Sequence, residues 1–589
     1  CETPAAVVYY RGRGQPQYRQ KGKRLAMEKN WKFSDIPYTH PDMQELQNRL
    51  DSLCGKLKAA KDMQTVKEVI SGRDEINQEI TVIQGVLYGR AFHDVTDEYY
   101  QTEFQTVLPQ MAALDTESLS QAIVESSFGG EIDAAYGPEF RRLLSLDARL
   151  HSKGKEQQAR AAELEAQYQQ MKATLTFEVR GEKISGGKLS ELLTSPDRAL
   201  RKEAFEASHK SYMEKKDEFS AVLRELVQTR DAIAKANGFE NYIEYATLSK
   251  SRLDYGHKEL LAFCEDVQKY IAPIYKRLQE EQRERLGLEK LMPYDRGLVF
   301  PDGNAKPVSS EAALAKAAYE MYHALSPEAG AFFDEMVAHE MLDVAGSEHK
   351  ISGMGFCTDI PGEWKMPFIF ANNNGTASDV TVYTHELGHG LQGYLSMRKQ
   401  PLSEYFMGSP DLCEVHSKTM ELYSYAYAPL FFGEQAEHFL QEHRFGIVKE
   451  FCSFCSTYLF ESWLYTHVDA SLEEWAKEDD RIAKSFGLGL NNEEWEKDIL
   501  GGYDLFNNMA VYMFPMYVIS YSLSEVCALQ LKATYEADPV EGWARYHALC
   551  EAGGGKSYSR IIGDAGLKLP YEPGVVEKTA KQLEKLIWG

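Results

Sequence analysis

Apolar residues recur at three- and four-residue spacing over most of the chain from Pro41 onward. That spacing is typical of amphipathic helices, because residues three and four apart lie on one face of a helix. Ser195 and Pro196 add a helix start, with the serine as N-cap and the proline at the first helical position. The pattern predicts a mostly α-helical fold, and its clearest helical stretches are 42–60, 74–92, 98–113, 155–174, 199–236 and 257–286.

Signals for β-strands are few and short. Residues 174–185 alternate apolar and polar positions around Arg180-Gly181, which predicts a hairpin. Two runs bounded by glycine and proline, 354–360 and 367–372, predict two further strands.

The region 287–308 is the clearest linker-like stretch of the chain, because it contains three prolines and Gly303. It predicts a division into an N-terminal helical lobe, residues 27–290, and a catalytic helical lobe, residues 291–589. The second lobe holds all the chemical motifs described below.

The charge balance narrows the choice of partners. Sixty-five basic residues stand against 89 acidic residues, a net charge of −24 over 589 residues. Binding to nucleic acid or to an anionic membrane needs a basic face, so we expect neither partner. The longest uncharged run near the C-terminus, 505–524, contains two asparagines and a proline, and therefore predicts a buried wall rather than a membrane span. No pattern indicates an oligomeric state.

The nine cysteines are odd in number and irregularly spaced, which argues against a disulfide framework and favours a reducing, cytoplasmic location. Cys452 and Cys455 form a single CxxC motif with no second pair, so we expect two buried residues on a helix rather than a metal site.

The first 26 residues differ from the rest of the chain. They hold six basic residues and one acidic residue, and no apolar segment of the kind that a secretory signal needs. We interpret residues 1–26 as a non-native leader or upstream segment before a start at Met27, with a basic transit peptide as the alternative.

The strongest chemical motif is His385-Glu386-Leu-Gly-His389. On a helix, residues four apart share a face, so His385 and His389 can bind one zinc ion. Glu386 lies beside the first ligand, where it can act as general base on a water molecule that the metal activates. A metzincin would need glycine at 392 and histidine at 395, and Gln392 and Leu395 exclude that class.

A catalytic zinc site needs a third protein ligand and one open position. Glu414 is the best candidate, on a second helical segment 25 residues beyond His389. Glu421 lies on the same face of that segment, where its carboxylate can orient a ligand histidine. His416 points away from this face, so we interpret it as a substrate-binding or structural histidine.

Several segments together resemble one known family. They are 32–38 (KFSDIPY), 355–357 (GFC), 370–380 (FANNNGTASDV), 385–389 (HELGH), 413–417 (CEVHS), 420–421 (ME) and 515–521 (PMYVISY). From about residue 30 to the C-terminus, the chain resembles the oligoendopeptidase F and PZ-peptidase group of the thimet-oligopeptidase-like zinc metallopeptidases.

The resemblance implies an elongated, two-lobed helical zincin with a deep substrate channel and a small β-sheet next to the metal-binding helix. It implies one zinc ion per chain, held by His385, His389 and Glu414, with Glu386 as base. We place Asp379, from the same motif block, with Glu421 among the residues that support the ligands. The implied activity is hydrolysis of internal bonds in short, unstructured peptides.

Substrate contacts are expected at two places. Gly355, Phe356 and Cys357 are candidates for a strand edge that binds the peptide backbone, and an ordinary buried strand is the alternative. The tyrosine-rich segment 510–521 can supply hydroxyl donors to the developing oxyanion. We predict this catalytic role for Tyr517 and Tyr521, and a weaker substrate contact for Tyr512.

One position departs from the family pattern. Family members usually carry a histidine five residues before the proline of this segment, where this chain has Ala510. That histidine is thought to help bind substrate or stabilise the transition state. Its absence leaves a second hypothesis, a zinc-containing peptide-binding homologue with little or no catalysis.

Overall fold

The computed structural model describes residues 31–151, 153–308, 310–351, 354–489 and 491–589. The leader predicted for residues 1–26 lies outside these described residues. The described chain is mostly helical and forms an elongated, two-lobed fold with a small β-sheet, as the sequence predicts. None of its helices is long and apolar enough to span a membrane.

The helices vary in length from 5 residues in α17 to 31 residues in α3. In chain order they are α2 (Met43–Lys58), α3 (Met63–His93), α4 (Glu98–Ala112), α5 (Glu117–Val124), α6 (Gly129–Tyr136), α7 (Pro138–His151), α8 (Lys155–Ala173), α9 (Gly186–Leu193), α10 (Arg198–Glu214), α11 (Lys216–Ala236), α12 (Tyr242–Ser249), α13 (His257–Tyr270), α14 (Ala272–Arg285), α15 (Glu311–Leu325), α16 (Pro327–Ala338), α17 (Ala377–Thr381), α18 (Leu387–Lys399), α19 (Pro410–Tyr423), α20 (Ala428–Phe432), α21 (Ala436–Leu464), α22 (Leu472–Ser485), α23 (Glu496–Leu500), α24 (Tyr503–Asn507), α25 (Met509–Met513), α26 (Ile519–Ala537), α27 (Pro539–Ala552), α28 (Tyr558–Asp564) and α29 (Val575–Trp588).

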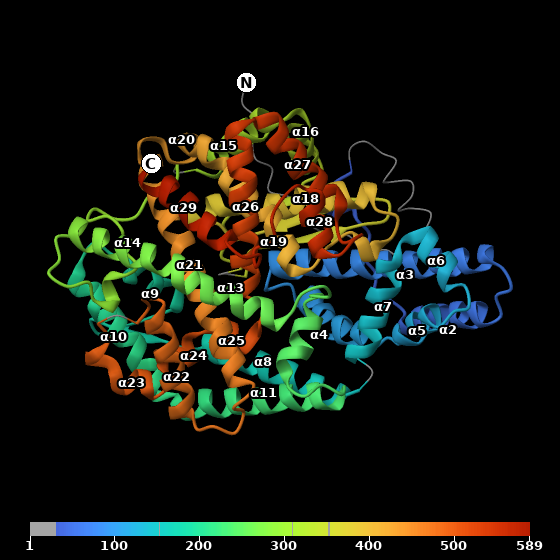
Figure 1. Cartoon of the computed structure of the whole chain (residues 1–589), viewed down its shortest axis with the longest axis horizontal. Coiled ribbons are helices and arrows are strands. Elements are labelled where there is room, and N and C mark those ends of the chain that lie inside the picture. The colour runs from blue at the N-terminus through green and yellow to red at the C-terminus, as the bar shows by residue number, and fades with distance from the viewer. Residues whose placement is uncertain (1–30, 152, 309, 352–353, 490) are drawn as a thin grey trace.

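Segments far apart in the sequence share the lobe that contains α10 and α11. Figure 1 shows α22, α23 and α24 beside α10 in the lower part of the molecule. Trp495 packs edge-on against Phe205 of α10, with ring centroids 5.1 Å apart, and Tyr512 of α25 stacks on Tyr168 of α8 at 3.8 Å. Helices from beyond residue 290 therefore pack directly against the first half of the chain, and the boundary at 290/291 stays a prediction.

The predicted hairpin is present. Strands β1 (Phe177–Val179) and β2 (Glu182–Ile184) pair antiparallel, and Arg180 and Gly181 form the two-residue turn. Both turn residues have positive φ, 53° and 81°, which is the conformation of a tight hairpin turn that fits the twist of the strands.

The helix start predicted at Ser195 is wrong by two residues. Helix α10 begins at Arg198, because the Asp197 carboxylate accepts hydrogen bonds from the N–H groups of Ala199 and Leu200. An aspartate cap satisfies two of the free N–H groups of the first turn, whereas Ser195 and Pro196 lie ahead of the helix.

A three-stranded sheet lies beside the helix that carries the histidines. Its strand order is β3 (Leu342–Asp343), β5 (Met366–Phe370), β4 (Phe356–Ile360), with β3 parallel and β4 antiparallel to β5. The sequence predicts β4 and β5 but not β3, which is too short to give a pattern. Since β5 is central, β4 forms one edge of the sheet.

The linker-like region is fixed to the helices around it. Asp295, whose side chain is fully buried, pairs with Arg201 at 2.7 Å and with Arg198 at 2.8 Å. Such a buried, doubly paired carboxylate ties this part of the linker-like region to the start of α10.

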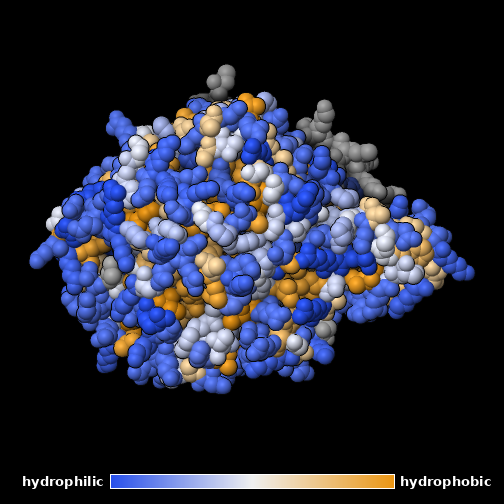
Figure 2. Space-filling view, in the orientation of Figure 1, coloured by the Kyte–Doolittle hydropathy of each residue, from blue (hydrophilic) through white to orange (hydrophobic). Residues whose placement is uncertain are grey.

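The visible surface is mostly hydrophilic, and hydrophobic side chains show mainly in the middle of the face (Figure 2). Cys452 and Cys455 are fully buried on α21, as expected for structural residues on a helix. All eight cysteines of the described chain carry free thiols.

Candidate metal centre

The two histidines lie on one helix that changes its winding at the motif. Helix α17 passes without a break into a π-helical turn, Val382–Glu386, and then into α18. His385 and Glu386 end the π turn, and His389 follows one turn later. Short π segments within α-helices are frequent at functional sites, because they change the direction in which side chains point.

A close helix contact brings Glu414 to the histidines. A Cβ atom at Gly388 would lie only 2.7 Å from the Ser417 Cα atom, so the glycine in the motif allows α18 to rest directly on α19. As a result, a Glu414 carboxylate oxygen lies 3.5 Å from Nε2 of His385 and 3.5 Å from Nε2 of His389.

The three predicted ligands therefore converge on one point. One donor atom from each lies within 4.8 Å of the others. Two imidazoles and one carboxylate are the donor set of a catalytic zinc site, which keeps its fourth position for water or substrate. The histidine side chains are 15% and 21% exposed, so the candidate site is reached from solvent. The residues present fit a zinc ion.

The charge state of Glu414 suits a ligand. Burial alone would raise its pKa, but hydrogen bonding and the charges of His389 and His385 outweigh it and lower the pKa to about 2. The Tyr517 hydroxyl donates to the other Glu414 oxygen at 2.8 Å. The carboxylate is thus ionised, and one oxygen is held in place while the other faces the histidines.

Glu421 binds the side of His385 that faces away from the other predicted ligands. Its Oε1 lies 2.6 Å from His385 Nδ1, which leaves Nε2 to face the metal position. Burial lowers the pKa of His385, but the Glu421 hydrogen bond and charge more than offset this and raise it to about 9. Zinc binding at such a histidine releases a proton, so metal affinity falls in acid.

The residues that hold Glu421 are not predicted from the sequence. Its second oxygen lies 2.8 Å from His443 Nε2, and His443 Nδ1 accepts from or donates to the Tyr425 hydroxyl at 2.7 Å. The buried Lys418 ammonium lies 3.5 Å from Glu421 and 3.1 Å from Glu450. Lys418 could have been found from its spacing to Glu421 on one helix, whereas His443 comes from α21 and gives no local signal.

Asp359 is a second missed residue, on the other side of the histidines. It lies on β4, half-buried, and burial raises its pKa to about 7 although the charge of His389 lowers it. An acidic residue in a short apolar strand was the only available signal. Because strand residues alternate, Cys357 and Asp359 share the face toward α18, while Phe356 packs against Tyr88 of α3.

The predicted tyrosines form a wall across from the metal position. Tyr517 and Tyr521 are half-buried, with ring centroids 5.7 Å apart. Burial and the charge of Glu414 raise the pKa of both hydroxyls far above neutrality, so both stay protonated and can donate.

The charge of Glu386 reaches both this wall and the sheet edge. Burial has the largest effect on the pKa of His385, of Cys357 on β4 and of Tyr521 on α26, and the charge of Glu386 adds a smaller rise to each. The Glu386 side chain is half-buried. A group that bridges a strand edge and a row of hydroxyl donors is well placed to meet a peptide lying between them.

Three predictions need correction or restatement. Tyr512 is fully buried, so it cannot contact a substrate as predicted, and His416 is fully buried too, which favours the structural one of its two predicted roles. Tyr512 instead donates its hydroxyl to the Phe219 carbonyl, and His416 Nδ1 lies 3.2 Å from the Cys413 carbonyl. The buried Asp379 accepts from the N–H groups of Asn374 and Gly375, so its hydrogen bonds shape the loop before α17 rather than hold a ligand.

Gly355, Phe356 and Cys357 lie where an added strand would pair. Gly355 precedes β4, and Phe356 and Cys357 begin it. The described residues offer β4 only one strand neighbour, β5, which leaves its other edge without a strand. Whether a peptide binds there stays a prediction.

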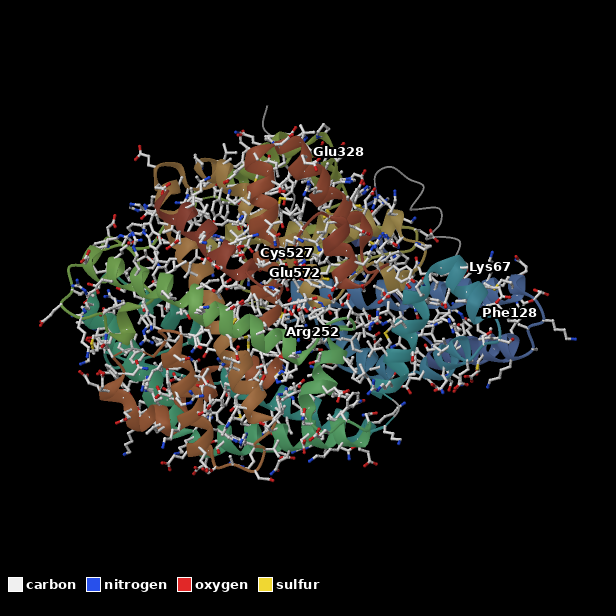
Figure 3. The ribbon with its side chains drawn as sticks, viewed as in Figure 1. Lys67, Phe128, Arg252, Glu328, Cys527 and Glu572 are labelled. Atoms are coloured by element: carbon white, nitrogen blue, oxygen red, sulfur yellow. The ribbon has the colours of Figure 1, made fainter. Side chains whose placement is uncertain are left out.

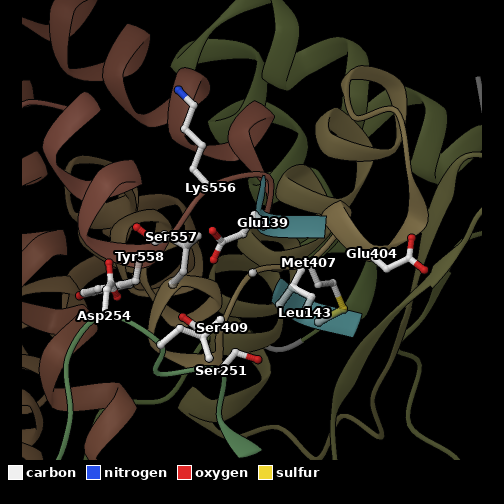
Figure 4. A pocket seen from close by; sticks show the side chains of 14 residues that line it. Glu139, Leu143, Ser251, Asp254, Glu404, Met407, Ser409, Lys556, Ser557 and Tyr558 are labelled. Atoms are coloured by element: carbon white, nitrogen blue, oxygen red, sulfur yellow. The ribbon is translucent and has the colours of Figure 1, made fainter. Parts of the chain in front are cut away.

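A cavity of about 120 Å³ lies near the start of α19 but does not include the ligands. It is lined by α7, the turn after α12, the segment before α19 and the loop before α28, and Figure 4 shows Glu139, Ser409 and Ser557 around it. Four segments remote in sequence meet there, so it marks a junction between parts of the fold rather than the reactive centre.

Comparison with known proteins agrees with this geometry. Residues 191–580 match the model of peptidase family M3, and residues 33–151 match the peptidase M3 N-terminal domain. The comparison with curated protein sequences gives no match.

Solved structures with the same fold carry related names. A protein described as an oligoendopeptidase F is 28% identical over 95% of this chain and 98% of its own, with a TM-score of 0.87. PZ peptidase A, solved with an inhibitor, is 29% identical over 94% and 99%, also at 0.87. A protein from Bacillus anthracis str. Ames, again described as an oligoendopeptidase F, is 29% identical over 94% and 98%, at 0.83.

The helical fold and the clustered histidines and glutamate define a metallopeptidase. The chain belongs to peptidase family M3. Within that family it groups with oligoendopeptidase F and PZ peptidase, as the sequence resemblance predicts.

Proposed function

We propose that this peptidase is a zinc-dependent endopeptidase that cleaves internal bonds of short, unstructured peptides. The observation that carries the proposal is the convergence of His385, His389 and Glu414, with the half-buried Glu386 next to His385 in the chain. The same donor set and neighbouring glutamate serve metal-assisted hydrolysis in other zinc peptidases.

Zinc, when bound, lowers the pKa of a coordinated water and polarises the substrate carbonyl. Glu386 accepts a proton from the attacking water and returns it to the amine that leaves. Tyr517 and Tyr521 remain protonated and can donate hydrogen bonds to the oxygen on which negative charge develops.

The edge of β4 supports a role in holding the peptide. A peptide that pairs with this edge would be extended, with its backbone held and alternate side chains pointing away. Folded proteins seldom offer a free extended segment, so pairing of this kind favours short, unstructured substrates. No side-chain preference is needed for such binding, because backbone groups are common to all peptides.

A second candidate function rests on Ala510. It lies half-buried on α25, and an alanine cannot supply the donor that relatives are expected to carry there. A zinc-containing homologue that binds peptides without cutting them would have this feature. The complete set of Glu386, His385, His389 and Glu414 favours the enzyme.

The test is cleavage of a mixed library of short, internally quenched peptides by the zinc-loaded protein. We expect internal cleavage that a chelator abolishes and that Glu386→Gln reduces by about 10²- to 10⁴-fold while zinc content is kept. Peptide binding by wild type without cleavage would contradict the enzyme and support the binding homologue.

A further inference from the structure

The ammonium group of Lys250 lies near the ring of Tyr517, and the hydroxyl of this tyrosine binds the predicted metal ligand Glu414. Lys250 ends helix α12, and its Nζ lies 5.9 Å from the centre of the Tyr517 ring. The hydroxyl at the far end of that ring donates to Glu414. Lys250 is half-buried and takes no part in the ligand set or its supports.

The fold fixes the place of Lys250. The next residue, Ser251, has a φ of 55°, which turns the chain sharply. Arg252 then enters the core, where its guanidinium binds Asp411 at 2.8 and 3.0 Å and the Met516 carbonyl at 3.0 Å. Figure 3 shows Arg252 near the middle of the molecule. Lys250 is therefore anchored to α19 and to the residue directly before Tyr517.

No carboxylate of the described chain lies within ion-pair distance of the Lys250 ammonium. The two acidic groups whose charges reach it are engaged elsewhere. Glu165 pairs with Arg230 at 2.9 Å, and Glu461 accepts from the Met516 N–H at 3.0 Å. Burial raises the pKa of Glu461 to about 8, so it is mostly neutral at pH 7. The contrast is Lys418, which has three carboxylates within 4.0 Å.

An uncompensated, partly desolvated ammonium favours an anionic partner. Burial lowers the pKa of Lys250, which shows that its charge lacks the solvation it would have in water. A carboxylate that approaches from solvent would restore this stabilisation through a charge-assisted hydrogen bond.

We propose that Lys250 binds a carboxylate of the peptide substrate, either the C-terminal carboxylate or an acidic side chain. The inference rests on the proposed function, since it assigns a substrate group to the same site. Phe514 adds an apolar contact, because it is 45% exposed and its ring centre lies 6.2 Å from that of Tyr517. The preferred peptide has a carboxylate close to an apolar group, near the cleaved bond.

The test compares matched peptides and matched variants of the zinc-loaded, full-length protein. One peptide pair differs only in a free or amidated C-terminus, and another only in an internal glutamate or glutamine. Lys250→Met keeps the length of the side chain and removes its charge, and Lys250→Arg restores a charge. Lys172→Met is the control, because Lys172 Nζ also lies 5.9 Å from a tyrosine ring, that of the fully buried Tyr168.

We expect Lys250→Met to raise KM about 10- to 100-fold for the carboxylate member of one pair, with kcat little changed. The uncharged member of that pair should be unaffected, Lys250→Arg should recover most of the loss, and Lys172→Met should match wild type. The pair that responds identifies the source of the carboxylate. The proposal would be overturned if Lys250→Met changed KM equally for both members of each peptide pair, or did not change KM at all.

Failure of the proposed function gives a different result. If wild type cuts no peptide, binding of the same pairs to the Glu386→Gln protein can be measured by calorimetry. The peptide with the carboxylate should then bind more tightly than its uncharged partner, and this difference should disappear when Lys250→Met is added to Glu386→Gln. That result would support the role of Lys250 even though the protein cuts no peptide. Equal affinities within both pairs would refute it.

Discussion

The two sides of the metal centre differ in how their polar groups are paired. Behind His385, the buried side chains of Glu421, Tyr425 and Lys418 and the half-buried His443 form contacts of 2.6–3.5 Å. In front, Glu386, Tyr521 and Lys250 are half-buried, and no ion pair within 4.0 Å joins Glu386 or Lys250 to the described residues.

This difference separates two tasks. Paired, buried groups have one favourable arrangement, so they can hold a ligand at a fixed angle. Partly buried polar groups without protein partners are less well stabilised than they would be in water. Substrate or its transition state can supply the missing interaction. We therefore expect changes behind His385 to act on metal affinity and changes in front to act on turnover or substrate binding.

The largest expected effect comes from removing Glu414, the predicted metal ligand that also accepts a hydrogen bond from Tyr517. Glu414→Ala should weaken zinc binding by more than about 100-fold, since even residues behind ligands are worth 10- to 100-fold. Zinc competition with a chromogenic chelator would measure this. Unchanged affinity would show that another residue completes the site.

Tyr517→Phe should lower kcat by about 10²- to 10³-fold, as the loss of one oxyanion donor does elsewhere. Zinc must be saturating, because the Tyr517 hydroxyl also binds Glu414. Tyr512→Phe is the matched control, since that hydroxyl donates only to the buried Phe219 carbonyl. A similar kcat for Tyr517→Phe and wild type would remove Tyr517 from the mechanism.

We expect the Arg252–Asp411 pair that anchors Lys250 to act on the stability of the fold. Burial would raise the pKa of Asp411, but Arg252 outweighs it, so the folded pKa lies below the ordinary 3.8. Its stabilisation is therefore complete above about pH 4 and is lost as pH falls through the folded pKa. Asp411→Asn should destabilise the fold by about 3–5 kcal/mol near neutral pH. It should also weaken the dependence of stability on acid.

Unfolding followed by circular dichroism between pH 3 and 7 would measure this change. Equal acid sensitivity in wild type and Asp411→Asn would show that other carboxylates govern acid unfolding. Arg252 and Lys250 are only two residues apart, so the same segment carries one paired and one unpaired cation.

The sequence predicts those parts of the site that are close in the chain or on one helix. His385, Glu386 and His389 follow from the spacing of one motif, and Glu421 follows from the helical repeat that begins at Glu414. The helical fold, the hairpin and two of the three strands of the sheet follow in the same way from periodicity.

The remaining parts depend on packing between distant segments. His443 reaches Glu421 only because α21 lies against α19, and Lys250 reaches Tyr517 only because Arg252 is buried against Asp411. Tyr512 and Tyr517 look alike in the sequence, and packing alone buries one ring against Tyr168 and leaves the other beside the ligands. No local pattern carries this information.

The most direct test of the account compares Glu386→Gln with Glu421→Gln in one experiment that measures zinc affinity and zinc-saturated kcat. The account predicts that Glu386→Gln keeps zinc affinity and loses turnover. It predicts that Glu421→Gln loses about 10- to 100-fold in affinity and recovers most of its turnover at saturating zinc. If both variants change the same quantity, the division between the two sides of the metal centre is contradicted.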